Sequence, residues 1–561
     1  MVQMKSHKPD SVHVEQHPES DTASGRTQLG PDGVAEKALD PTTASSGGDI
    51  GGAWLAQYDG HRPELTEESN RIMSRRIDMS LLPIIFAIYF CQQLDKSSIS
   101  FAAVFGFQAD AGLQGSEYSW LSSIIYFAQL VFQPLSVYAL VKFPVNYWIC
   151  FCFFGWGISC MILAAFKSFP GLLVFRFILG AFEASISPSM LIIVSMWWTR
   201  REQPLRNNIW YSANGIALIL GSLLAYGLAN WSTSLYTYQL IFIFSGAIAV
   251  LIAIPTVFFL PAHPTTARFL SPEQKYLALE RVRLNNTGTQ NTHFDWSQVR
   301  ECFTDLKTWG FVVMIFCVSF VSGGISAFGP LILQGFGLGP FQTILYNMIP
   351  GAIAIVANIL AAFAVQTSKR KSPIILIILI FPVAAAAALY ALPRGPEWTQ
   401  RLLAVYFILQ IFQPITPIIF SWAFANTAGH TKKTATTGAL YIGLCVGNIV
   451  GPQLYMQTER PYYRTGLTAN LVVLCVLFGV VILQALYLAY LNKRNNKRRL
   501  ASGKTGRNID YSLENSSNWA SMRAAEAERN LADGGAAGEV YNANAFADLT
   551  DLKNEDFVYS L

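Results

Sequence analysis

Long apolar stretches separated by short polar connections dominate the chain from residue 81 to residue 491. Each stretch reaches about 20 residues, the length that an α-helix needs to cross a bilayer. The pattern predicts an all-α membrane protein with twelve transmembrane helices, six on each side of a longer polar link. The expected ranges are 81–103, 117–141, 146–167, 170–197, 207–229, 236–260, 309–333, 341–366, 372–392, 402–425, 436–456 and 466–491.

The grouping of the apolar stretches divides the chain into five parts. Residues 76–260 and 309–492 are expected to form two six-helix halves, and residues 261–308 to form the linker between them. Residues 1–75 are rich in Ser, Thr, Gly and Asp, which is typical of a disordered tail, and residues 493–561 form a second polar tail. Two six-helix halves joined by such a linker are the layout of the major facilitator fold, in which a central site lies between two repeats.

The polar linker carries its own helix signals. The sequence SPEQ, from Ser271 to Gln274, is a capping box with proline at the first helical position. Asp295 precedes a second short segment and is a good N-cap residue. We therefore expect two short helices in the linker.

Basic residues predict the orientation in the bilayer. With both termini placed in the cytoplasm, the four short inner connections hold nine Lys and Arg residues, whereas the outer connections hold five. The bias follows the positive-inside rule. We expect a multi-pass protein with both termini in the cytoplasm.

Composition agrees with a membrane protein and excludes several functions. The chain has 561 residues, of which 52% are hydrophobic and 13% charged, whereas soluble domains carry about 25% charged residues. The net charge of +5 is spread over tails and loops, which gives no reason to expect a nucleic-acid partner. All seven histidines lie in tails, loops or helix ends, and no phosphate-binding G-x-x-x-x-G-K motif is present. We expect no enzyme, no cofactor and no metal site, and a monomer in the lipid bilayer.

Two charged residues interrupt the first apolar stretch, in the sequence LDKSSIS. Each charge costs about 2.5–3.5 kcal/mol at the centre of a membrane helix on insertion scales. Helical geometry places Asp95 and Lys96 on adjacent faces, with Gln92 and Ser100 on the stripe of Lys96. One side of this helix is therefore predicted to be polar at mid-membrane depth.

The fourth stretch, FRFILGAFEASISPS, repeats this pattern. Arg176, Gly180, Glu183 and Ser187 share one helix face, and Arg176 and Glu183 are two turns apart. Protonation of Asp95 or Glu183 would free Lys96 or Arg176 to bind an anion, which would couple a proton to a substrate. The alternative is that the four charges only form structural salt bridges between the two helices.

Other polar residues lie at spanning depth. Gln129, Asn214, Ser326 and Asn448 are candidate substrate contacts, and Asn214, beside Gly215, is the best of them. The alternative for each residue is an interhelical hydrogen bond without a role in binding.

Several motifs resemble the fungal allantoate permease family, which belongs to the anion:cation symporter group of the major facilitator superfamily. They are FRFILGAFEASISPSMLIIVSMWWTRREQPLRNNIWYSANGIALILGSLLAYGL, LDKSSISFAAVFG, GGISAFGPLILQGFG and NTAGHTKKTATTGALYIGLCVGNIVGPQLY, and with the linker the resemblance covers residues 75–495. It implies proton-coupled symport of a small organic anion across the plasma membrane. It also implies proton coupling by Asp95 and Glu183 and binding of the substrate's carboxylate by Lys96, and the arginine of the family's fourth helix falls on Arg176.

The chain departs from the family at two candidate positions. Lys96 stands where many members have arginine, and Gln129 replaces a tyrosine. Lysine lacks the bidentate fork of arginine, so a different anion is expected. The same fold also serves two other hypotheses, an exporter of an acidic secondary metabolite and a non-transporting nutrient receptor.

Overall fold

The computed structural model describes residues 54–55, 58, 60, 63, 67–198, 202–283, 295–368, 370–393, 395–460, 462–501, 550–554 and 557–561. Within these ranges the ordered elements are helices, and no strand occurs. The larger part of the expected 1–75 tail and residues 502–549 of the expected C-terminal tail lie outside the described residues.

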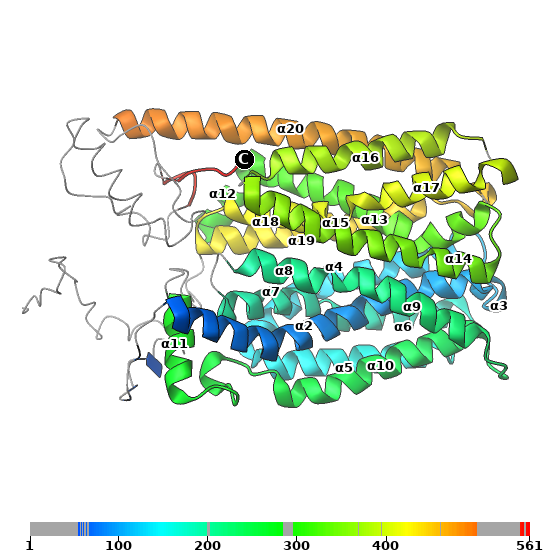
Figure 1. Ribbon diagram of the computed structural model, residues 1–561, viewed down its shortest axis with the longest axis horizontal. Coiled ribbons are helices and arrows are strands. Elements are labelled where there is room, and N and C mark those ends of the chain that lie inside the picture. The colour runs from blue at the N-terminus through cyan, green and yellow to red at the C-terminus, as the bar shows by residue number, and fades with distance from the viewer. Residues whose placement is uncertain are drawn as a thin grey trace, which may run out of the picture. The chain divides into compact units, whose positions relative to one another are not determined.

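The N-terminal half comprises the helices that precede the linker (Figure 1). They are α2 (Glu67–Val104), α3 (Phe107–Asp110), α4 (Glu117–Lys142), α5 (Val145–Leu163), α6 (Phe169–Glu183), α7 (Ile186–Trp197), α8 (Gln203–Tyr211), α9 (Ala213–Ala229) and α10 (Thr237–Phe259).

The linker and the C-terminal half follow. The linker holds α11 (Pro272–Arg283) and α12 (Trp296–Thr304); the half holds α13 (Leu306–Gly335), α14 (Pro340–Tyr346), α15 (Met348–Ser368), α16 (Ser372–Ala391), α17 (Thr399–Leu409), the 3₁₀ turn η4 (Gln410–Phe412), α18 (Ile415–Ala425), α19 (His430–Gln453) and α20 (Arg464–Ala501).

Four expected spans are divided into two helices; one, 207–229, is divided between α8 and α9 at Ser212, and the other three are divided at prolines. Proline removes a backbone donor and clashes with the carbonyl four residues earlier. The breaks between α6 and α7, between α14 and α15 and between α17 and α18 lie just before Pro188, Pro350 and Pro414, respectively. Each pair still follows one expected transmembrane range.

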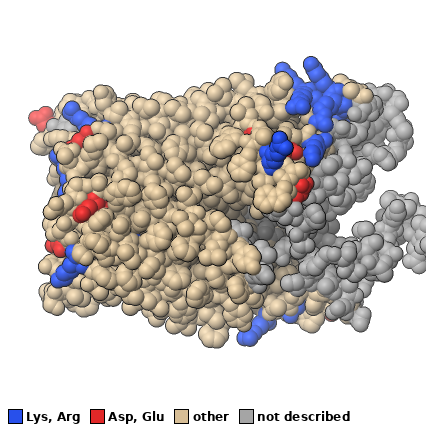
Figure 2. Space-filling model, turned by 180° about the vertical axis from the view of Figure 1, so that it is seen from behind, with Lys and Arg blue, Asp and Glu red and all other residues tan. Residues whose placement is uncertain are grey.

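The twelve expected spans correspond to helical stretches of the structure. Eleven stretches of the described residues are long and apolar enough to cross a membrane. The remaining range, 117–141, is the 26-residue helix α4, which packs against α6 and α19. Figure 2 shows an uncharged belt on one face of the protein, with Lys, Arg, Asp and Glu gathered at its two ends.

Two helix ends differ from the expectation. Helix α2 begins at Glu67, inside the 1–75 segment that was expected to be disordered, and α20 continues to Ala501, beyond residue 492. Hydropathy misses these turns because they are polar. The early turns of α2 are held by side-chain contacts, since Arg281 of α11 donates to Asn70 (2.5 Å) and Arg206 donates to Asp78 (2.8 Å).

Both predicted linker helices are present with their caps. At the start of α11, the Gln274 amide nitrogen donates to the Ser271 hydroxyl (3.3 Å), and the Ser271 amide nitrogen donates to the Gln274 side chain (3.1 Å). At the start of α12, the Asp295 carboxylate accepts from the Ser297 amide (2.8 Å). We call the end of the bundle that carries these helices the linker side.

The two halves meet most extensively where α4 packs against α19 and α9 packs against α15, and they also meet where α2 packs against α13. Helices α9 and α15 touch backbone to backbone at two glycines. A Cβ atom on Gly351 would lie 2.6 Å from the Gly215 carbonyl oxygen, and a Cβ atom on Gly215 would lie 2.4 Å from the Gly351 carbonyl oxygen. This contact leaves no room for a side chain.

Gly351→Ala is therefore expected to lower the stability of the protein by about 1–3 kcal/mol, the usual cost of overpacking. Gly227→Ala in α9 is the matched control, because a Cβ atom there meets nothing within 4 Å and alanine favours the helix. Thermal unfolding of both variants in one detergent tests this. A Gly351→Ala protein that melts at or above the wild-type temperature would contradict the packing described.

Candidate functional site

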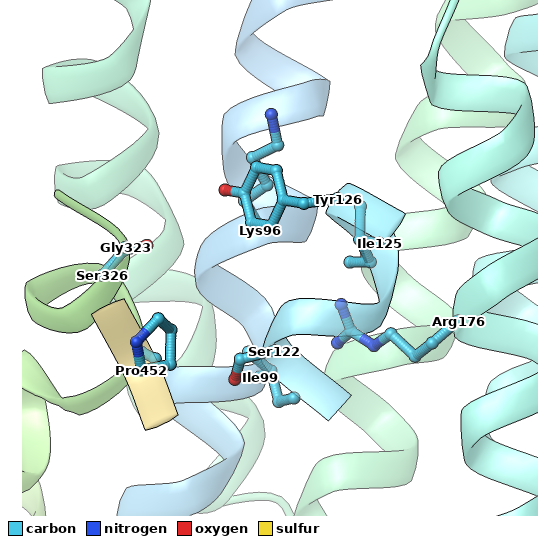
Figure 3. A pocket seen from close by; sticks show the side chains of 10 residues that line it. Lys96, Ile99, Ser122, Ile125, Tyr126, Arg176, Gly323, Ser326 and Pro452 are labelled. Atoms are coloured by element: carbon cyan, nitrogen blue, oxygen red, sulfur yellow. The ribbon is translucent and has the colours of Figure 1, made fainter. Parts of the chain in front are cut away.

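A narrow cavity lies between the two halves, and four of the predicted polar positions are at or beside it (Figure 3). Its lining comes from five helices: Lys96 and Ile99 of α2, Ser122, Ile125 and Tyr126 of α4, Arg176 of α6, Gly323, Ser326 and Ala327 of α13, and Pro452 of α19. In Figure 3 Arg176 lies on one side, and Gly323, Ser326 and Pro452 lie on the other. The N-terminal half supplies the cations, and the C-terminal half supplies small residues.

Lys96 forms an ion pair with Glu183 across the α2–α6 contact. Its Nζ lies 2.7 Å from Glu183 Oε1, and 19% of the Lys96 side chain remains exposed, compared with 1% of Glu183. Gln92 Nε2 donates to the same Oε1 atom (2.8 Å). The face shared by Gln92 and Lys96 was expected from their spacing on the helix.

The second oxygen of Glu183 lacks these contacts. Glu183 Oε2 is buried and has no hydrogen-bond partner among the described residues. A buried carboxylate oxygen without a hydrogen bond is costly, because it has lost its water partners and gained none. Protonation there would neutralise the carboxylate and weaken its hold on Lys96.

Arg176 is the second cation at the cavity. It is 1% exposed, and within the described part of the chain neither its Nη1 nor its Nη2 atom has a hydrogen-bond partner. Its guanidinium lies over the Phe242 ring, 5.4 Å from the centroid. A buried guanidinium without a hydrogen-bonded partner is suited to bind an anion, because its donors form a planar fork.

Asp95 points away from Lys96 into the interior of the N-terminal half. Its carboxylate accepts from Trp156 Nε1 (3.1 Å) and from Cys160 Sγ (3.1 Å), both on α5. The two charges of LDKSSIS therefore serve different faces, as their spacing on the helix predicts. Of the salt bridges considered in the structural alternative, the Lys96–Glu183 pair is present.

The other candidate residues differ in location. Ser326 lines the cavity. Asn214 donates to Gln413 Oε1 in the other half (3.3 Å), and Asn448 donates to the Leu444 carbonyl within α19 (2.9 Å). Gln129 is buried in α4 and is not among the lining residues.

Sequence reasoning missed two polar groups at this site. Tyr126 lines the cavity, and its ring centroid lies 5.7 Å from Lys96 Nζ. Ser122 lies one turn before it on α4. Their spacing of four residues was a usable signal, but tyrosine and serine are too common in membrane helices to stand out without the neighbouring cation.

Hydrogen bonds join the two halves on the side opposite the linker. Tyr118 of α4 donates to the Ala327 carbonyl of α13 (2.7 Å), and Ser123 donates to the Ile449 carbonyl of α19 (2.9 Å). Farther out, Arg460 donates to Gln108 Oε1 (3.1 Å). These contacts tie the ends of the halves together beyond the cavity.

Comparison with known proteins agrees with this architecture. The sequence profile of the Major Facilitator Superfamily matches residues 85–452. The chain belongs to the major facilitator superfamily. Members of the superfamily are transporters, not enzymes, and this major facilitator protein is a multi-pass membrane transporter.

Several relatives cover most of this major facilitator protein. An uncharacterized transporter of Schizosaccharomyces pombe is 33% identical over 79% of this chain and 83% of its own. The allantoate permease of Saccharomyces cerevisiae is 29% identical over 89% of this chain and 88% of its own, which confirms the family resemblance seen in the motifs. The MFS-type transporter cnsL of Penicillium expansum is 31% identical over 79% of this chain and 84% of its own.

Solved structures show the same fold at low identity. A bacterial homolog of the human lysosomal transporter Spinster, in an inward-facing and occupied conformation, matches with a TM-score of 0.53 and 15% identity over 72% of this chain and 96% of its own. A D-xylose-proton symporter matches with a TM-score of 0.53 and 13% identity over 72% and 97%. Both support the expected twelve-helix major facilitator fold.

Proposed function

We propose that this transporter carries a small organic anion together with a proton by alternating access. The observation that carries the proposal is the Lys96–Glu183 ion pair at 2.7 Å, beside a cavity where the Arg176 Nη atoms have no hydrogen-bond partner among the described residues. The pair supplies a titratable switch, and Arg176 supplies a cation for the anion.

Proton and anion binding are linked through the charge of Lys96. While Glu183 is ionised, it neutralises Lys96, and an anion in the cavity faces only Arg176. When Glu183 takes a proton on Oε2, Lys96 becomes a second net cation at the cavity. Anion affinity therefore rises with protonation, and by reciprocity the bound anion favours the protonated state of Glu183.

The lining indicates the kind of anion. Two cations suit a carboxylate, and the hydroxyls of Ser122, Tyr126 and Ser326 can hydrogen-bond to polar groups on the rest of the molecule. Ile99 and Ile125 add a short apolar surface. A small carboxylate, such as a vitamin-like compound, a ureide or an amino-acid derivative, fits these groups.

We assign the coupling proton to Glu183 and a supporting role to Asp95. Glu183 touches Lys96, whereas Asp95 faces α5, where two donors keep its carboxylate hydrogen-bonded. Asp95 therefore remains a second titratable group of the N-terminal half, coupled to the cavity through the backbone of α2.

The proposed location is the plasma membrane, with the linker side in the cytoplasm. The excess of Lys and Arg in the connections on that side supports this orientation. One relative bears the name allantoate permease, which supports passage of a small molecule across a membrane by this chain as well. The same cycle run in reverse would export an acidic metabolite.

Uptake of labelled small carboxylates into proteoliposomes tests this function. With the outside more acidic than the lumen, at least one compound of the panel is expected to accumulate above its external concentration, and a protonophore is expected to abolish the accumulation. Equilibration without any response to the pH gradient would refute proton coupling. Accumulation of neutral compounds alone would refute the anion assignment.

A further inference from the structure

Residues 550–554 and 557–561 pack against the linker side of the C-terminal half. We call these two short segments together the strap. Residues 502–549 separate it from α20 along the chain. It contacts α13, α18 and α20, the first and later helices of the half. In Figure 1 the described end of the chain lies beside α12, α18 and α20.

Asp551 of the strap completes a buried charge cluster. Lys307 at the start of α13 and Lys432 at the start of α19 both pair with Asp551 and with Asp305, and all four side chains are 0–1% exposed. The Lys432–Asp551 distance is 3.0 Å. Two buried ammonium groups thus meet two buried carboxylates, one of which comes from the strap.

Glu301 of α12 lies at the edge of this cluster. It pairs with Lys432 (2.9 Å) and accepts from the Thr550 hydroxyl (2.9 Å). Burial raises the pKa of the Asp305 carboxyl, but the ammonium groups of Lys307 and Lys432 outweigh this effect and hold the pKa below its usual value. Asp551 is the fully buried carboxylate that contacts both lysines together with Asp305, so its loss would leave the two buried ammonium groups with a single shared buried partner.

Side chains of the C-terminal half also form hydrogen bonds with the strap backbone, as in a peptide-binding groove. Asn426 donates to the Ser560 carbonyl (3.0 Å) and accepts from the Ser560 amide (2.8 Å). Asn492 likewise donates to the Tyr559 carbonyl (2.9 Å) and accepts from the Tyr559 amide (2.9 Å). Further donors to strap carbonyls are Trp422 to Ser560, Asn495 to Phe557, and Arg498 to Leu552 and Lys553.

Helices α13 and α19, whose first turns pair with Asp551, also supply the cavity lining of the C-terminal half. Helices α13 and α19 touch backbone to backbone along a glycine stripe: a Cβ atom on Gly447 would lie 2.5 Å from the Phe316 carbonyl oxygen, and one on Gly451 would lie 2.2 Å from the Phe320 carbonyl oxygen. The far parts of the same two helices carry Ser326 and Pro452 at the cavity. The position of the pair at its anchored end therefore affects the cavity lining.

We propose that the strap is an intramolecular peptide ligand whose binding to this groove holds the α13–α19 pair in place, and whose release loosens it. Three features support a ligand rather than a fixed part of the bundle. The strap is not helical beyond a single turn, hydrogen bonds to its backbone and ion pairs to Asp551 hold it beside the buried Tyr559 ring, and residues 502–549 separate it from α20. The proposal does not depend on the identity of the transported molecule.

Hydrogen exchange of the full-length protein in detergent tests the proposal. Asp551→Asn removes one carboxylate from the buried cluster, and Thr550→Glu sets a carboxylate against Glu301 without removing any buried charge. Both variants are expected to speed exchange on the order of tenfold in the strap and in the first turns of α13 and α19, while α5 in the other half keeps its protection. Lys553→Gln is the matched control, because the Lys553 side chain is exposed, and should exchange like the wild type.

A protease site inserted between residues 502 and 549 tests whether the strap stays bound once its covalent link to α20 is cut. After cleavage, the fragment that contains the strap is expected to remain with the wild-type transporter on gel filtration and to dissociate from the Asp551→Asn protein. Three results would overturn the proposal: unchanged exchange at α13 and α19 in both variants, faster exchange in all helices alike, or loss of the wild-type fragment on cleavage.

Discussion

Replacing Glu183 by glutamine is expected to abolish accumulation of the transported anion against its gradient while leaving exchange of the anion across the membrane. Glutamine has the shape of protonated glutamate and carries no charge, so Lys96 remains a net cation throughout the cycle. A proton gradient of one pH unit supplies about 1.4 kcal/mol, or about tenfold accumulation per proton. The variant is expected to show an accumulation ratio near one.

The measurement compares pH-driven uptake with counterflow in the same proteoliposomes. Glu117→Gln is a matched control, because this carboxylate accepts from the Gln114 amide (2.8 Å) at the start of α4, away from the cavity. It should accumulate the anion like the wild type. Gradient-driven accumulation that survives in Glu183→Gln would remove Glu183 from the coupling mechanism.

Arg176→Lys is expected to weaken anion binding by about 10- to 100-fold. Lysine keeps the charge but loses the planar fork that can bind a carboxylate through two parallel hydrogen bonds. A hydrogen bond to a charged group contributes about 1.5–3 kcal/mol, which corresponds to this range. The shorter ammonium also loses the stacking of the guanidinium over Phe242.

The concentration dependence of counterflow measures this loss without a proton gradient. Arg401→Lys is the control, since that guanidinium lies over the Trp398 ring (4.6 Å) outside the cavity lining. An unchanged half-saturation concentration in Arg176→Lys would mean that the anion does not contact Arg176. A loss of the same size in Arg401→Lys would point to a general effect of charge.

The fold was largely predictable because a bilayer imposes one strong rule on its helices. An apolar run of about 20 residues that satisfies its own backbone has few alternatives to a spanning helix. The ends were less predictable. The polar first turns of α2 depend on Arg206 and Arg281 from other helices, and such contacts leave no periodic signal in the chain.

The candidate site could be predicted where it contains charged residues, because burying a charge in a membrane helix has a large free-energy cost. Lys96, Arg176 and Glu183 were found because charges in an apolar run are expensive, and the helix period placed each on a face. The partners were only partly predictable: the helix period separates Asp95 from Lys96, but only the packing of α5 directs Asp95 to Trp156 and Cys160. Hydroxyl groups such as Ser122 carry too small a cost to be recognised.

The strap lay beyond sequence reasoning for a related reason. Residues 550–554 and 557–561 belong to a polar tail, and their groove is made of side chains from several helices and the linker. Asp551 becomes distinctive only beside Lys307 and Lys432, which are 244 and 119 positions away along the chain.

Proton uptake upon anion binding is the direct readout of the proposed coupling between the anion and Glu183. Purified transporter in weakly buffered solution near neutral pH is mixed with the anion identified by the uptake panel, and a pH indicator reports the protons bound. We expect the wild-type protein to take up a proton as the anion binds, and the Glu183→Gln protein to bind the anion without proton uptake. Anion binding to the wild type with no proton uptake at any pH, or equal uptake by both proteins, would contradict the account.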